Sequence, residues 1–294
     1  MPPGFQSLRE ITISMPDSPP DARYYKSLVE LRALLVLPKL DLLHLDNIHA
    51  LPGVHGFTLE LQPRSVNVSN LYFRRTGLSS EEVWSLIQPI RALRSLTLEE
   101  CPFPGAETTG ITSLVERVVA SHRQHLQSLT FPAQRIEFRD TSRFPLGQFS
   151  SVRNLKHITI NIRDLEHLPN SFAWPEALEM PSLTFLELLG THPLDATATS
   201  SLDATLAHAI ESGLMPELRC VDPRKVQLPI SRTNLGGGPM AGEFSSRREA
   251  FPLLCELGMK RGFVVLTSWE EDVRAFVPDL PRNTTQANIA DYME

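Results

Sequence analysis

Several features are scarce or missing in this chain of 294 residues, and each absence excludes a class of protein. There are three cysteines, Cys101, Cys220 and Cys255, which are too few and too scattered for a disulfide framework and form no Cys-x-x-Cys metal clip. No apolar run reaches the roughly 18 residues that a membrane span requires, and the first residues lack the pattern of a secretory signal. We therefore expect an intracellular protein, cytoplasmic or nuclear, with no membrane partner.

The chain also lacks any concentration of basic residues. It carries 28 Lys and Arg against 34 Asp and Glu, for a net charge of −6, and its cations are spread along the sequence. A nucleic-acid partner is therefore not expected, because such proteins gather positive charge on one face. The hydrophobic content of 41% is that of a folded globular chain, so wholesale disorder is excluded as well.

What the sequence does contain is a recurring spacing, apolar-x-x-apolar-x-apolar, which is clearest in the run from Leu93 to Cys101. The copies are Leu8/Ile11/Ile13, Leu40/Leu43/Leu45, Val68/Leu71/Phe73, Leu93/Leu96/Leu98, Leu126/Leu129/Phe131, Leu155/Ile158/Ile160 and Leu183/Leu186/Leu188. Successive copies begin about 25 to 33 residues apart, close to the roughly 20 to 29 residues of a leucine-rich repeat.

The physical basis of this spacing is a short strand in each unit. The second and third apolar side chains alternate along that strand and point to one face, where a single unit cannot bury them. Stacked units bury them in ladders and join their strands into a parallel sheet. The sequence therefore predicts an α/β leucine-rich-repeat solenoid, a right-handed horseshoe of irregular repeats with the sheet on its concave face, over residues 1–266.

Helical patterns fall between the expected strands, as the return of each strand to the same sheet requires. Ser79 and Glu82 are spaced as a capping box ahead of an apolar stripe that Pro89 ends or bends. Further helices are expected over residues 24–35, 111–118 and 202–210, the last closed by Gly213.

Other segments do not fit the repeat. Residues 46–66 and 161–182 lack a helical stripe and contain prolines, so loops, or an extra strand over 57–61, are expected there. A flexible loop is predicted over about 222–244, which contains the run Gly236-Gly237-Gly238-Pro239. Residues 245–266 then predict a closing unit, a helix over 247–260 and a strand over 263–266, followed by a polar tail over 267–294.

With its Leu-x-x-Leu-x-Leu-x-x-Cys run, the chain resembles the leucine-rich-repeat region of F-box-type proteins, particularly the divergent ones abundant in fungi, over about residues 5–266. In that family the repeats select a substrate, and a separate F-box docks the adaptor of a ubiquitin ligase. The first strand is expected at Leu8, and no Leu-Pro-x-Glu opening of an F-box occurs, so binding of that adaptor is not expected.

Side chains between the fixed apolar positions are predicted to point to the concave face, where such solenoids bind partners. The middle column is Thr12, His44, Tyr72, Thr97, Thr130, Thr159 and Glu187. The candidate partner-binding residues are His44, Asp46, Tyr72, Arg74, Thr97, Glu99, His157, Asn161, Phe185 and Glu187. Tyr72, Arg74 and Phe185 are the favoured anchors, because Tyr and Arg dominate interface energetics and a large exposed ring invites a contact.

No motif predicts catalysis, a cofactor or a metal. His122 and His125 could share a helix face but have no acidic or Cys partner at ligand spacing, so they are expected at the surface or a helix end. His49 and His55 are expected in loops, and Cys101 is expected to pack in the turn of its repeat. The sequence predicts a non-enzymatic scaffold that binds an unidentified protein, and the resemblance to F-box-type proteins implies a substrate-recognition module. Two alternatives stay open, a hydrolase or metal-dependent enzyme in an irregular fold, and a degenerate repeat fragment without a partner.

Overall fold

The computed structural model describes residues 7–15, 25–26, 28–50, 61–101, 108–130, 146–162, 179–190, 194–228, 244 and 246–267. These residues form an α/β fold with one nine-stranded sheet in which every pair of neighbouring strands is parallel. The sheet ends at β1 on one side and β11 on the other and is not closed into a barrel.

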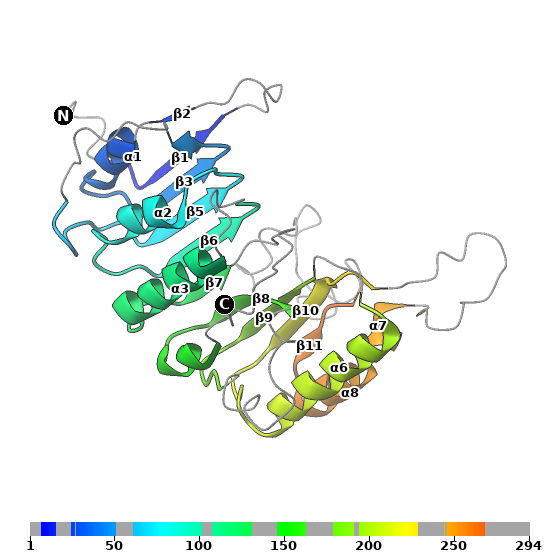
Figure 1. Ribbon diagram of the computed structural model, residues 1–294. Coiled ribbons are helices and arrows are strands. Elements are labelled where there is room, and N and C mark those ends of the chain that lie inside the picture. The colour runs from blue at the N-terminus through cyan, green and yellow to red at the C-terminus, as the bar shows by residue number, and fades with distance from the viewer. Residues whose placement is uncertain are drawn as a thin grey trace, which may run out of the picture.

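The strands follow one another across the sheet in chain order (Figure 1). They are β1 (Glu10–Ser14), β3 (Leu42–Asp46), β5 (Asn70–Arg74), β6 (Ser95–Glu99), β7 (Ser128–Thr130), β8 (His157–Asn161), β9 (Phe185–Leu189), β10 (Cys220–Lys225) and β11 (Val264–Val265). The short strands β2 (Tyr25–Lys26) and β4 (His49–Ala50) form a separate parallel pair. Each strand is thus joined to its parallel neighbour by a crossover connection.

The described helical segments lie within these crossovers and on one side of the sheet (Figure 1). They are α1 (Leu28–Leu35), α2 (Ser80–Ile87), α3 (Thr108–His122), the 3-10 helix η2 (Leu146–Ser151), α6 (Ala196–Glu211), α7 (Arg247–Ala250) and α8 (Pro252–Arg261). Neighbouring helices contact one another in chain order: Arg32 of α1 donates to the Ser85 carbonyl of α2, and Arg117 of α3 pairs with Glu81 of α2.

The backbone repeats the same hydrogen bonds from one strand to the next. At β3 and at each strand from β5 to β10, the N–H groups of the residue before the strand and of its first residue both donate to a single carbonyl of the preceding unit. The accepting carbonyls belong to Arg9, Asp41, Ser69, Arg94, Gln127, Lys156 and Thr184. Directly after β3, β5 and β6 the chain turns through a residue with positive φ, Asn47, Arg75 and Glu100 respectively.

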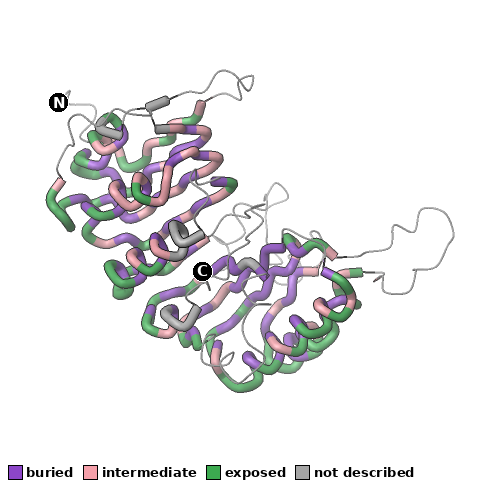
Figure 2. The backbone as a smooth tube through the Cα atoms, in the orientation of Figure 1, coloured by how far each residue is buried: buried purple, intermediate pink, exposed green. Residues whose placement is uncertain are grey.

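The core lies between the sheet and the helices, where buried residues run along the strands (Figure 2). Leu96 and Leu98 are completely buried, and their register partners Leu71, Phe73 and Leu129 are buried beside them. The predicted burial of the β6 leucines is therefore confirmed. Phe131, the third apolar residue of the next copy, lies outside the described residues.

Two of the predicted helices have the expected ends, and a third has the expected buried stripe. Ser79 and Glu82 form the capping box of α2, each accepting a hydrogen bond from the backbone of the other, and the helix stops at Ile87 before Pro89. Gly213, with φ of 79°, follows α6 as its predicted stop signal. Leu114, Val115 and Val118 of α3 are buried as the second stripe predicted.

Four local predictions were wrong. The loop expected from residue 222 begins later, because 222–225 complete β10, and residues 229–243 lie outside the described part. The closing helix is split at Phe251, whose backbone is not helical (φ −125°, ψ 56°) and which precedes Pro252. The first helix begins at Leu28, since Tyr25 and Lys26 pair with β4, which also makes His49 a strand residue. His55 and most of the strand expected over 57–61 are outside the described residues.

The closing unit is attached to α6 through a buried carboxylate. Asp203 of α6 accepts hydrogen bonds from the N–H groups of Leu253 and Leu254 in the first turn of α8, both at 2.9 Å. At the other end, Arg261 donates to the carbonyls of Ile210 and Glu211, which terminate α6. The two helices therefore satisfy each other's unpaired terminal groups.

Candidate functional site

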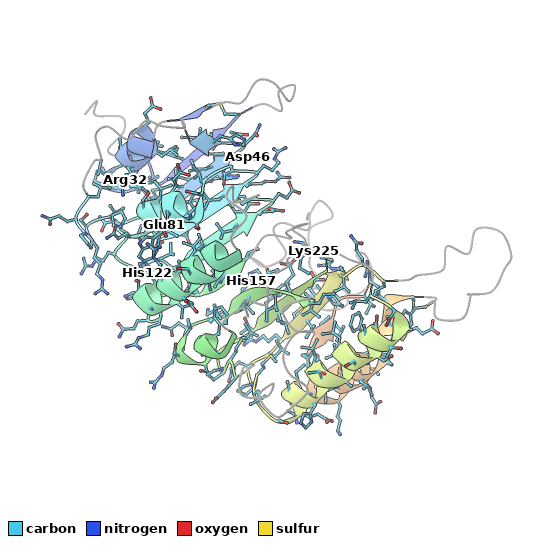
Figure 3. All side chains as sticks on the ribbon, viewed as in Figure 1. Arg32, Asp46, Glu81, His122, His157 and Lys225 are labelled. Carbon is cyan, nitrogen blue, oxygen red and sulfur yellow. The ribbon has the colours of Figure 1, made fainter. Side chains whose placement is uncertain are left out.

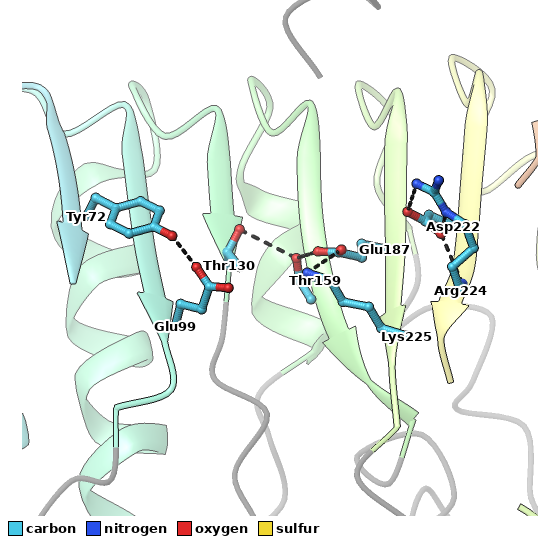
Figure 4. Close-up of polar contacts among 8 residues, drawn as sticks. All are labelled: Tyr72, Glu99, Thr130, Thr159, Glu187, Asp222, Arg224 and Lys225. Atoms are coloured by element: carbon cyan, nitrogen blue, oxygen red, sulfur yellow. Dashed lines mark hydrogen bonds and ion pairs between the residues drawn. The ribbon is translucent and has the colours of Figure 1, made fainter. Parts of the chain in front are cut away.

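The side of the sheet away from the helices carries polar side chains, and we call it the polar face. On β5 the alternation is clear, because Leu71 and Phe73 are buried against the helices whereas Asn70, Tyr72 and Arg74 are half-buried on the opposite side. Figure 4 looks onto the polar face, with helices behind the strands. The alternation of apolar and polar residues in the sequence thus creates this surface.

Strand register aligns the polar side chains in rows across neighbouring strands. The middle row is Thr12, His44, Tyr72, Thr97, Thr130, Thr159, Glu187 and Asp222. A second row holds Ser14, Asp46, Arg74 and Glu99, and a third includes Ser128, His157 and Phe185. The predicted candidates therefore lie on one face, although His157 and Glu187 are separated from the His44 to Glu99 group by β7. The side chain of Asn161 is outside the described part.

Tyr72 is held by its neighbours on both sides. Its hydroxyl donates a hydrogen bond to Glu99 on β6 (Figure 4), and its ring meets that of His44 on β3 edge-to-face at 4.3 Å between centroids. Burial, and then the contact with Glu99, raise the pKa of Tyr72 well above its ordinary value, so the phenol remains a donor. The result is an aromatic side chain with a fixed orientation on the polar face.

Asp46 lies in the second row of the polar face, and both of its carboxylate oxygens accept hydrogen bonds. Arg75 donates to both of its carboxylate oxygens, at 3.1 and 3.0 Å, and Ser14 donates to Oδ2. Burial works to raise the pKa of Asp46, but these hydrogen bonds outweigh it, so the pKa lies below its ordinary value. Asp46 is therefore charged and stabilises the fold by binding Arg75. The sequence did not single out Arg75.

Arg74 differs from Arg75 in lacking such a partner. It is half-buried between Asp46 and Glu99 in the strand register, yet no ion pair among the described residues includes it. Its Nε is enclosed by protein atoms and has no hydrogen-bond partner in the described part of the chain. Both neighbouring carboxylates are bound elsewhere, Asp46 by Arg75 and Glu99 by Tyr72.

The polar face changes character after β7, where its middle row becomes buried. Thr159 is 1% exposed and donates to Glu187 at 2.6 Å, and Lys225 pairs with the other oxygen of Glu187 at 2.8 Å (Figure 4). Burial alone would lower the pKa of Lys225, but Glu187, Glu99 and Asp222 together outweigh it and raise the pKa. Glu187, a predicted partner-binding residue, is thus already bound within the fold.

Asp222 and Arg224 form a second buried ion pair on β10. Two side-chain hydrogen bonds join them, from Nε to Oδ1 at 2.8 Å and from Nη2 to Oδ2 at 2.6 Å, and the Arg224 backbone N–H also donates to Oδ1 at 3.0 Å. Asp222 is 2% exposed. Asp222 stands directly opposite Glu187 in the register. Like charges at such positions repel, so each carboxylate is stabilised by a cation of its own, Arg224 for Asp222 and Lys225 for Glu187.

His157 and Phe185 form the second aromatic pair on the polar face. Their rings meet edge-to-face at 4.8 Å, and His157 Nδ1 lies 3.2 Å from the hydroxyl of Ser128. Burial lowers the pKa of His157, although Glu187 acts against this. Phe185, predicted as an exposed anchor, is half-buried with one edge taken up by His157.

The labelled residues of Figure 3 separate the polar face from the helical layer. Asp46, His157 and Lys225 belong to strands spread along the sheet, whereas Arg32, Glu81 and His122 belong to helices. His122 ends α3 as one prediction had it, but it is buried, and its Nδ1 accepts from the N–H of Leu93 at 3.4 Å. Burial lowers its pKa to about 4, so this histidine is neutral at physiological pH.

The described residues do not assemble a metal site. No group of three or more His, Cys, Asp or Glu side chains in this part of the chain could hold a metal ion. Cys101 is buried, with its sulfur near the carbonyls of Phe73 and Glu99, and burial raises its pKa, which disfavours the nucleophilic thiolate.

None of the described helices has the length and apolar character needed to cross a membrane.

Sequence reasoning missed several residues of the polar face. Asp222, Arg224 and Lys225 were assigned to a loop because Pro223 occupies the third apolar position of the repeat spacing. The spacing of Leu218 and Val221 matches the first two positions and could have revealed the strand. Arg75 was missed because it follows its strand in a left-handed turn, from which its side chain reaches back to Asp46.

Comparison with known proteins adds no identification. No protein-family model matches the chain, and no curated protein matches it.

Proposed function

We propose that the chain is a leucine-rich-repeat solenoid with a right-handed course, whose polar face is the concave surface. Support comes from the apolar spacing, which recurs in step with the parallel strands, and from the carbonyl that accepts two N–H groups at β3 and at each strand from β5 to β10. The positive φ of Asn47, Arg75 and Glu100 after successive strands supports the same repeat. Units built alike and stacked in chain order are what define this architecture.

On that fold, the proposed function is that of a non-enzymatic scaffold that binds another protein through the polar face. One observation carries the proposal: from β1 to β6 the middle row of this face remains accessible, with Thr12 exposed and His44, Tyr72 and Thr97 half-buried. Rigid strands displaying accessible aromatic and polar side chains are suited to protein recognition. Substrate recognition, as implied by the resemblance to F-box-type proteins, is the role we favour for this scaffold.

The ion pairs on β9 and β10, whose carboxylates are buried, favour an unequal use of the face. Glu187 and Asp222 each have a cation within the chain, so a partner would gain little by contacting them. The accessible part from β1 to β6 is therefore the proposed contact surface, and β8 to β10 its internally stabilised continuation.

Two variants, each with an arginine introduced on a different side of the sheet, test this function. Thr97→Arg alters the accessible middle row, and Glu116→Arg alters an exposed position of α3 in the helical layer. Proteins copurifying with the tagged chain are quantified by mass spectrometry. The proposal requires a protein that is retained by wild type and Glu116→Arg and lost from Thr97→Arg. Equal retention by both variants would contradict it.

A further inference from the structure

On the polar face from β1 to β6, Arg74 is a cation that makes no ion pair with any described residue. Asp46 is held by Arg75 and Ser14, and Glu99 by Tyr72, so both acids beside Arg74 already have direct partners. Arg74 has no ion pair with any described residue, and its buried Nε donates no hydrogen bond to any of them. Because Nε is enclosed by protein atoms, the two terminal nitrogens of this half-buried guanidinium are the ones that can bind an oxyanion.

The surroundings of Arg74 restrict what that oxyanion can belong to. Arg74 lies on β5, and the positions directly beside it are Asp46 on β3 and Glu99 on β6. Two fixed carboxylates repel a polyanion such as nucleic acid or an acidic membrane, and they disfavour a doubly charged phosphate more than a single carboxylate. The site therefore fits one isolated negative charge on an otherwise uncharged segment.

The neighbouring side chains add an apolar contact next to the cation. Tyr72 precedes Arg74 on the same strand by two residues and lies on the same face, and its ring is fixed by Glu99 and His44. A partner side chain adjacent to the acidic residue can pack on these rings without first ordering them, which lowers the entropic cost of binding. Tyr and Arg together form the usual centre of a protein interface.

We infer that Arg74 receives the carboxylate of one Asp or Glu of a bound polypeptide, while Tyr72 and His44 contact the residue beside it. This inference rests on the proposed function and names the chemistry of its partner. A fork of two N–H donors from Arg74 to the carboxylate gives the contact its directionality, which a lysine at the same position would not reproduce.

Short randomised peptides with one fixed central residue test the inference directly. The full-length chain is offered three pools, with Glu, Gln or phosphoserine fixed at the centre, and the retained fraction of each pool is measured. The Glu pool should be retained about tenfold better than the Gln pool. In Arg74→Gln this preference should fall to about one, in Arg74→Lys it should be reduced, and in Arg94→Gln, a matched exposed arginine before β6, it should be unchanged.

The outcomes separate the inference from the function on which it rests. A wild-type ratio near one, no retention of the Glu pool, or a ratio that survives Arg74→Gln overturns the inference. A phosphoserine pool retained better than the Glu pool also overturns it, in favour of a phosphorylated partner. If all pools bind alike and Tyr72→Ala abolishes binding, the polar face binds polypeptides without an anion site. If Tyr72→Ala leaves every retention unchanged, the proposed function fails as well.

Discussion

Arg75 binds both carboxylate oxygens of Asp46 across two neighbouring strands, although Arg74, one residue earlier, is the register partner of Asp46. The left-handed turn at Arg75, with φ of 51°, places the second arginine where it can reach back. Consecutive arginines therefore differ, since Arg75 binds Asp46 whereas Arg74 has no ion pair among the described residues.

The first prediction compares these two arginines. Arg75→Met should lower the free energy of unfolding by about 1 to 3 kcal/mol, because it leaves the Asp46 carboxylate without its main partner. Arg74→Met should leave it unchanged or raise it, because it removes a buried donor that has no partner in the described structure. Urea denaturation of both variants beside wild type measures the difference. A larger loss from Arg74→Met would show that Arg74 has a structural role.

The same pair should give stability a defined pH dependence. The pKa of Asp46 is lower in the folded chain than its ordinary value, so the pair contributes fully above the unfolded pKa of about 4 and its contribution is lost as pH falls through the folded pKa. The difference in unfolding free energy between wild type and Arg75→Met should therefore shrink below about pH 4. A difference that stays constant with pH would argue against an ionic contribution.

The stability that Asp203 contributes should depend on pH in the opposite direction to that of Asp46. Burial raises its pKa, and the N–H groups of Leu254 and Leu253 only partly offset this, so its ionised form is less favourable in the folded chain than in the unfolded one. Its contribution is greatest below the unfolded pKa and is lost as pH rises through the folded pKa. Asp203→Ala, which leaves both N–H groups without an acceptor, should cost about 1 to 3 kcal/mol at neutral pH.

Thermal unfolding of Asp203→Ala, Asp203→Asn and wild type across pH checks this. Asp203→Asn keeps one acceptor and should lie between the other two at neutral pH, and the advantage of wild type over Asp203→Asn should grow on acidification. If Asp203→Ala melts with wild type, the attachment of α8 to α6 does not depend on this carboxylate.

The core makes the clearest stability prediction. Leu96 is completely buried between the register partners Leu71 and Leu129, so Leu96→Ala should cost about 2 to 5 kcal/mol. Thr97→Ala changes the next residue, on the polar face, and should cost far less. Chemical denaturation of the two variants compares the two sides of β6. Near-neutral behaviour of Leu96→Ala would contradict its place in a packed ladder.

These residues also show how much of the structure the sequence could predict. Leu96 and Thr97 were placed on opposite faces correctly, because alternation along a strand follows from backbone geometry alone. Ser79 and Glu82 were predicted as a capping box for a similar reason, since the interaction is local and has a fixed spacing. Local periodicity thus sufficed for the strands of the large sheet from β1 to β9 and for the middle row of the polar face from Thr12 to Glu187.

The pairing of side chains across strands was not predictable in the same way. Which cation binds Glu187 depends on the register shift in β10 that brings Lys225 beside β9, and the strand itself was concealed by Pro223. Which arginine binds Asp46 depends on one left-handed residue. Both are properties of three-dimensional register, and no short pattern in the sequence encodes them.

The Glu187 network allows a test by double-mutant cycle. Glu187→Ala should destabilise the fold, because it leaves the Thr159 hydroxyl and the Lys225 ammonium without their acceptor. The half-exposed Lys225 is partly screened by solvent, so Lys225→Met should cost less. Combined, the two changes should be less costly than their sum, with a coupling of about 0.5 to 3 kcal/mol in denaturation experiments. Simple additivity would mean that the ion pair contributes nothing.

The central claim is that the polar face from β1 to β6 contacts a protein partner, and photo-crosslinking measures this contact most directly. A benzophenone amino acid replaces Thr97 on the polar face in one variant and Glu116 in the helical layer in the other, each in the full chain. After irradiation with the proteins of the source cell, crosslinked products are identified by mass spectrometry. The account predicts a specific polypeptide product from position 97 and none from position 116. Products from position 116 alone, or the same products from both positions, would contradict it.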